Sequence, residues 1–170
     1  MTAARPQRKS PPALGPVFWL ALGLAVGGGI VSAPAILAAP SERIVVDAHT
    51  GLAISGFDPV AYFTDAKPKF GRPDMELRLD ATVWRFRNEG NRAAFAEHPE
   101  VYLPRFGGYD PVAIARGVSV PGHPLFWTIT GERLYLFYSG EARAAFLAEP
   151  GLILERAMRR WPAVARTIAR

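Results

Sequence analysis

Hydrophobic and polar residues alternate in two separate segments of this chain. Residues 75–79 alternate apolar and polar side chains, a polar turn follows at 80–82, and apolar residues return at 83–86. The same order recurs at 126–129, 130–132 and 134–138. Alternation on both sides of a short turn is typical of a β-hairpin. The pattern therefore predicts two hairpins, and the short apolar run at 44–46 predicts a strand before them.

Each expected hairpin leads into a segment with helical features. Residues 88–97 and 139–148 begin with Asn88 and Ser139, which are favourable N-cap residues. Pro99 and Pro150 follow these segments, and we expect them to end the helices.

The last segment, residues 152–168, predicts a basic amphipathic helix that Pro162 bends or divides. We expect its apolar face to dock on the domain, and binding to an anionic membrane surface is the alternative. The residues expected on that face are Leu154, Met158, Trp161, Val164 and Ile168.

The two hairpin–helix segments belong to an internal duplication. The phrase Gly56-Phe57-Asp58-Pro59-Val60-Ala61 recurs as Gly108-Tyr109-Asp110-Pro111-Val112-Ala113, and further matches follow in both copies. In each copy, an Asp before a Pro should cap a short helix. We therefore predict an α+β fold with two β-hairpin–helix repeats, about 56–106 and 108–158. We expect them to pack around one small antiparallel sheet and a pseudo-twofold axis.

The N-terminal residues 1–39 have the features of a leader helix. No charged residue lies between Lys9 and Glu42, and this apolar stretch is long enough to cross a hydrocarbon layer of about 30 Å. Basic residues precede it. We expect a signal peptide or an N-terminal membrane anchor. The domain at 40–170 would then be exported, either free in the periplasm or anchored on the periplasmic side of the inner membrane.

The composition excludes several classes of partner and of functional site. The formal net charge is +5, but three of the positive charges lie in the leader, so nucleic acid is not an expected partner. The chain has no cysteine, which excludes disulfides, thiolate metal sites and thiol nucleophiles. The sequence has no nucleophile elbow, phosphate-binding loop or dinucleotide fingerprint outside the leader. We therefore assign no catalytic residue.

The combined pattern resembles the YHS-domain family, which is related to the TRASH group, and especially its exported single-chain members. The resemblance covers about 43–161 and rests on 56–63, 91–95, Tyr102 and 107–109. It implies metal ligation by cysteines at set positions, with copper as the candidate metal. In this chain those positions hold Ala61, Arg87 and Asn91 in the first copy, Ala113, Tyr138 and Ala142 in the second, and Asp110 after the Gly-Gly-Tyr.

Because these positions lack sulfur, we expect an exported binding or accessory module of YHS type without enzymatic activity, and we assign no cofactor. One alternative is a periplasmic copper-handling protein with His123, Asp58, Asp110 or Met75 as ligands. Another is a small hydrolase or isomerase that uses Asp110. The expected partners are a small ligand or an envelope protein, with membrane contact through the N-terminal segment.

Six residues are candidates for binding. The two Asp residues are either a carboxylate pair or helix caps, and the aromatic residues either line a pocket between the repeats or form the core. His123 lies in a loop between Gly122 and Pro124. The candidate binding residues are Asp58, Tyr62, Tyr109, Asp110, His123 and Trp127.

Overall fold

A computed structural model describes residues 43–168, all within the contact unit Ala38–Arg170. The predicted leader, residues 1–39, lies outside the described residues. No helix among residues 43–168 combines the length and hydrophobicity that a bilayer crossing requires.

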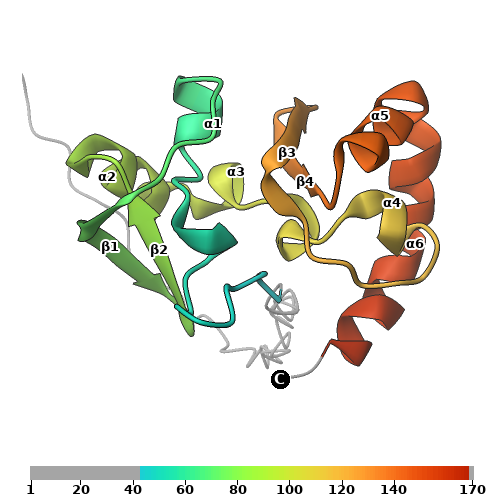
Figure 1. The fold of residues 1–170 in the computed structure, drawn as a ribbon, viewed down its shortest axis with the longest axis horizontal. Helices are drawn as coiled ribbons and strands as arrows, with labels where there is room; N and C mark the ends of the chain where they lie inside the picture. The colour runs from blue at the N-terminus through green and yellow to red at the C-terminus, as the bar shows by residue number, and fades with distance from the viewer. Residues whose placement is uncertain (1–42, 169–170) are drawn as a thin grey trace, which may run out of the picture. The chain divides into compact units, whose positions relative to one another are not determined.

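The fold is mixed α/β and contains each expected hairpin followed by its helix (Figure 1). The first repeat comprises α1 (Ala61–Thr64), β1 (Arg72–Leu79), β2 (Thr82–Phe86), α2 (Glu89–Glu97) and α3 (Pro99–Tyr102). The second comprises α4 (Pro111–Ile114), β3 (His123–Thr130), β4 (Arg133–Phe137), α5 (Gly140–Ala148) and α6 (Pro150–Thr167). Two short 3-10 segments, η1 (Ile54–Gly56) and η2 (Arg105–Gly108), precede α1 and α4.

Each hairpin forms its own two-stranded antiparallel sheet, β1–β2 and β3–β4. The expectation of one common sheet was therefore wrong. The two hairpins share their irregularity as well as their length, because the register shifts between Arg72 and Glu76 in the first and between His123 and Trp127 in the second. The duplicated sequence thus specifies the same local backbone twice.

The helix caps and the helix ends were predicted correctly, since α2 ends at Glu97 before Pro99 and α5 ends at Ala148 before Pro150. The side chains of Asn88 and Ser139 accept hydrogen bonds from Asn91 N and Ala142 N and cap α2 and α5. Pro99 and Pro150 also begin the next helices, α3 and α6, which the sequence analysis did not predict. Proline suits the first helical position because its missing N–H would have no partner there.

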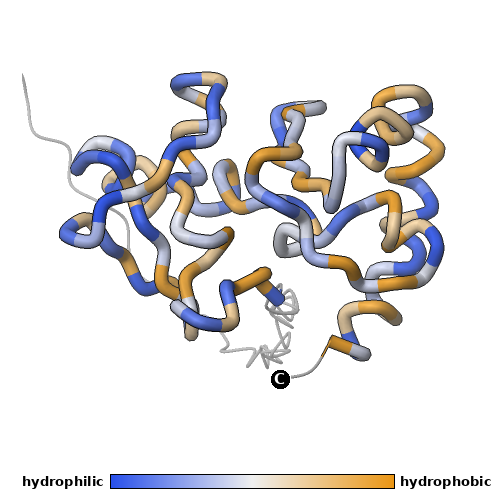
Figure 2. Tube along the Cα trace, in the orientation of Figure 1, coloured by the Kyte–Doolittle hydropathy of each residue, from blue (hydrophilic) through white to orange (hydrophobic). Residues whose placement is uncertain are grey.

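α6 continues through Pro162 as one helix, so the expected division does not occur. Figure 2 shows hydrophobic and hydrophilic residues interspersed along it. Leu154, Trp161 and Val164 contact the domain core, as expected. Met158 is exposed, so its predicted place on the apolar face was wrong.

Residues 44–46 do not form the predicted strand. They make single backbone contacts instead: Val45 N donates to Gly107 O, and Ile54 N donates to Val45 O. Val46 and Ala53 also form an isolated antiparallel β-bridge. This segment therefore ties η1 of the first repeat to η2 of the second.

A glycine at the same position of each repeat, Gly71 in the first and Gly122 in the second, lets the chain pass close to the backbone of its own repeat. Gly71 N donates to Gly56 O, and Gly122 N donates to Gly108 O, both at 2.9 Å. A Cβ at Gly122 would lie 2.6 Å from both the Gly108 carbonyl oxygen and the Leu136 Cβ. The recurrence of this glycine in both copies therefore reflects a close backbone approach, not only a turn.

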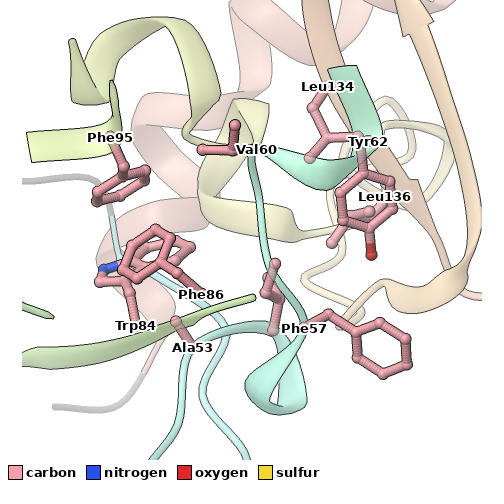
Figure 3. Packing of buried hydrophobic residues seen from close by; sticks show 10 residues of the cluster. Ala53, Phe57, Val60, Tyr62, Trp84, Phe86, Phe95, Leu134 and Leu136 are labelled. Atoms are coloured by element: carbon pink, nitrogen blue, oxygen red, sulfur yellow. The ribbon is translucent and has the colours of Figure 1, made fainter. Parts of the chain in front are cut away.

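Strand β4 separates two hydrophobic clusters. Side chains alternate between the two faces of a strand, so Leu134 and Leu136 pack in one cluster and Tyr135 and Phe137 in the other. The other buried residues of the first cluster lie between positions 53 and 95, and the cluster is seen in Figure 3 around Trp84 and Phe86. β4 is therefore buried on both faces, and the second repeat supplies part of the core of the first.

The repeats contact each other head to tail. The hydroxyl of Tyr62 on α1 donates to Pro124 O at 2.9 Å, and its ring packs edge-on against Trp127 of β3. The residue equivalent to Tyr62 in the second repeat is Ile114, which packs in the cluster that α6 covers. A twofold axis would place equivalent residues in equivalent contacts. The expected pseudo-twofold packing was therefore wrong, and α6 covers the face of the second repeat that has no further repeat beside it.

Replacing Tyr62 with Phe tests this contact. The substitution keeps the ring but leaves the buried Pro124 carbonyl without its donor, so the free energy of unfolding should fall by about 1–2 kcal/mol. Urea denaturation of the full-length protein in detergent measures it. Tyr138→Phe is the control, because that side chain is 65% exposed, and an equal loss in both variants would contradict the assignment.

Candidate functional site

Asp58 is fully buried and is held by four N–H donors. Its Oδ1 accepts from Val60 N at 2.8 Å and Ala61 N at 3.3 Å, which caps the turn that leads into α1. Its Oδ2 accepts from Arg87 N at 2.8 Å and from the Asn91 side-chain amide at 2.7 Å. The capping prediction is confirmed. The carboxylate also joins the start of the repeat to the junction between β2 and α2.

Asp110 occupies the equivalent place in the second repeat and is 2% exposed. Its Oδ1 accepts from Val112 N at 2.8 Å and caps α4, and its Oδ2 accepts from Tyr138 N at 3.0 Å. Its predicted cap is also confirmed. Ala142 stands where Asn91 stands in the first repeat, so no side-chain amide reaches this carboxylate from that position.

The aromatic candidates lie mainly in the core. Tyr62 is buried, and Trp127 is partly buried against it. Tyr109 is partly buried and packs beside Trp161 of α6. These three residues stabilise the domain, and none of them lines a cavity described below.

His123 is the first residue of β3, so its predicted place in a loop was wrong. Its side chain is exposed and lines an open groove of about 570 Å³ between the repeats. The groove floor and walls include Phe57 and Phe70, whose ring centroids lie 4.0 Å apart, and Leu125. Phe70 is 64% exposed and Leu125 is 55% exposed. Exposed apolar side chains that gather in a concave surface are typical of an interaction site.

Basic groups border this groove. Lys69 forms an ion pair with Asp65 at 2.7 Å. For the Arg87 side chain, no hydrogen bond or ion pair is found within residues 43–168. The Nδ1 atom of His123 accepts a hydrogen bond from Leu125 N at 3.2 Å, which directs the proton of the neutral ring to Nε2. The groove therefore combines apolar contact area with a net positive edge.

A second cavity, of about 460 Å³, opens beside Asp110. Its lining includes Ala113, Tyr138 and Ala142, which are three of the positions where the resemblance implied ligands. The lining contains no histidine, so the carboxylate has no imidazole partner there for acid–base chemistry.

The described residues contain no cluster of three or more His, Cys, Asp or Glu side chains that could hold a metal ion. Asp58 and Asp110 each bind donors within their own repeat. Met75 packs against the first hydrophobic cluster. Among residues 43–168, Asp58, Asp110 and His123 therefore do not belong to such a cluster.

The sequence analysis did not identify Phe70 and Leu125 as site residues. Both stand beside turn residues, and hydropathy alone gives no reason why such side chains remain exposed. The alignment of the two repeats did contain a clue to the cavity beside Asp110, because the position of Asn91 in the first repeat is held by the smaller Ala142 in the second. That difference becomes informative only when both residues are seen next to the Asp of their repeat.

Comparisons of this chain with protein-family models, with curated proteins and with solved structures find no match.

Removing each Asp should destabilise the protein by different amounts. Asp58→Ala orphans four donors and should lower the free energy of unfolding by about 3 kcal/mol or more, whereas Asp110→Ala orphans two and should cost about half as much. Urea denaturation measures both. Asp74→Ala, which removes only an exposed ion pair, is the control, with an expected change below about 0.5 kcal/mol. Equal losses for the two buried positions would contradict the donor count.

The stability should also depend on alkaline pH through Tyr62. Burial, and to a smaller extent the charge of Asp58, raises the pKa of the Tyr62 phenol in the folded state. The unfolded phenol has a pKa of about 10, so the contribution of Tyr62 is complete below that pH and is lost as the pH rises above it. The stability difference between the native protein and Tyr62→Phe should therefore shrink between pH values of about 8 and 11. If the stability difference between the two proteins stays constant across this pH range, the pKa of Tyr62 is not raised in the folded state.

Proposed function

We propose that this protein is a non-enzymatic binding module of YHS type, exported to the cell envelope, and that the groove between its repeats holds a segment of a partner protein. The observation that carries the proposal is the pair of exposed side chains, Phe70 and Leu125, beside the basic Arg87 and Lys69. We infer a partner segment in which apolar side chains stand next to acidic ones.

The arrangement of the groove supports a peptide more than an enclosed small molecule. The apolar side chains are exposed at an open surface, where a partner can cover them without any change in the domain. When a partner covers side chains such as Phe70, each Å² of apolar surface removed from water contributes about 25 cal/mol to the binding free energy. Because Asp65 already neutralises Lys69, the Arg87 guanidinium is the group that would select for an acidic residue.

The geometry supports binding more than the two alternatives. Both buried carboxylates act as structural acceptors for backbone N–H groups, which accounts for their burial without a reaction. Copper handling and hydrolysis remain hypotheses from the sequence that no contact among residues 43–168 favours.

Peptide selection tests the proposal. A displayed library of random peptides is selected against the full-length protein in detergent, and the affinity of an enriched peptide is measured by fluorescence anisotropy. We expect enrichment of segments that combine apolar and acidic residues. Leu125→Asp should weaken binding by on the order of tenfold or more, because it places a charge in the apolar contact.

Val118→Asp is the matched control, because Val118 is 54% exposed and lies outside the groove. It should leave the affinity within about twofold. Arg87→Glu keeps the backbone N–H that Asp58 needs and should shift the selection toward basic peptides. No enrichment, or equal weakening by Val118→Asp and Leu125→Asp, would refute the groove as the binding site.

A further inference from the structure

The two repeats differ at one partly buried position next to the buried Asp of each repeat. In the first repeat, the amide of Asn91 donates to Oδ2 of Asp58 at 2.7 Å. In the second repeat, Ala142 takes the place of Asn91, and Oδ2 of Asp110 accepts one hydrogen bond from the described residues, from Tyr138 N. The first repeat therefore shows which chemical group the second one lacks: an N–H donor that reaches Oδ2 from the side of the following helix.

The missing side chain coincides with a cavity. Asp110 and Ala142 both line the space of about 460 Å³ at this point, and Asp110 is 2% exposed. A buried carboxylate is stabilised by each further donor that it gains. A cavity of this size is large enough for a small molecule that carries such a donor.

The charges around the cavity favour a cation. Asp110 and Glu141 are acidic and Arg116 is basic, so the lining has a net negative charge. Tyr138 stands where the first repeat has Arg87, which replaces a positive side chain with an aromatic ring at the edge of the cavity. An aromatic face attracts an organic cation, and a guanidinium group would repel one.

We propose that the cavity beside Asp110 binds a small organic cation, an amidinium or a primary ammonium, whose N–H group donates to Oδ2 of Asp110. The ligand takes the position that the Asn91 amide takes beside Asp58. Its apolar part contacts Val112 and Ala142, and Tyr138 covers its charge from the rim. This site is separate from the groove between the repeats and does not depend on the function proposed for that groove.

Binding of benzamidine tests the proposal, with benzoate as the probe of the same shape and the opposite charge. The full-length protein is labelled with ¹⁵N in detergent and titrated with each compound. Benzamidine should shift the amide resonances of Val112 and Tyr138, whose N–H groups contact Asp110, in a saturable way. Benzoate should leave them unchanged because it has no N–H donor and carries the charge of the site.

Ala142→Asn is the decisive variant. It restores the side chain that the first repeat has, occupies the part of the cavity next to Asp110 and supplies the amide, so it should weaken benzamidine binding by on the order of tenfold or more while the protein stays folded. Ala144→Asn makes the same change on the same helix outside the lining and should leave the affinity as it is. The proposal is overturned if benzamidine does not bind, if benzoate binds equally well, or if both Asn variants bind benzamidine like the native protein.

Discussion

The fold depends on strand β4, which is buried on both of its faces. Leu134 and Leu136 complete the core of the first repeat, while Tyr135 and Phe137 belong to the core of the second. The equivalent strand β2 buries only one face, through Trp84 and Phe86. One strand with two apolar faces therefore joins the two halves of the duplication, because neither hydrophobic cluster is complete without it.

The head-to-tail arrangement explains why two similar sequences have different surroundings. The first repeat packs Tyr62 against the second hairpin, and the second repeat packs Ile114 in the cluster under α6. An array of repeats in which each unit contacts the next leaves one face uncovered at its end, and a terminal element must cover it. α6 has this role: Leu154, Trp161 and Val164 belong to the core of the domain, while Met158 and the basic residues of the helix face solvent.

The matched Asp residues show how a duplicated structural device can diverge. Both carboxylates cap a short helix and fix the start of the helix after the hairpin, and this shared role explains why the phrase around them is repeated. Asn91 completes the set of donors in one repeat, whereas Ala142 leaves a cavity in the other. A site of this kind costs little stability, because the backbone N–H groups of Val112 and Tyr138 still hold Asp110 in place.

The sequence by itself determined the local elements: both hairpins, the caps at Asn88 and Ser139, and the capping role of Asp58 and Asp110. These follow from the spacing of side chains within about ten residues, where hydrogen bonding and alternation act directly. Tertiary structure alone decided that the hairpins form separate sheets, that the repeats pack head to tail, and that Phe70, Leu125 and Ala142 line concave surfaces. The physical reason is that these features depend on which apolar faces meet, and the two repeats present similar faces that could have met in more than one way.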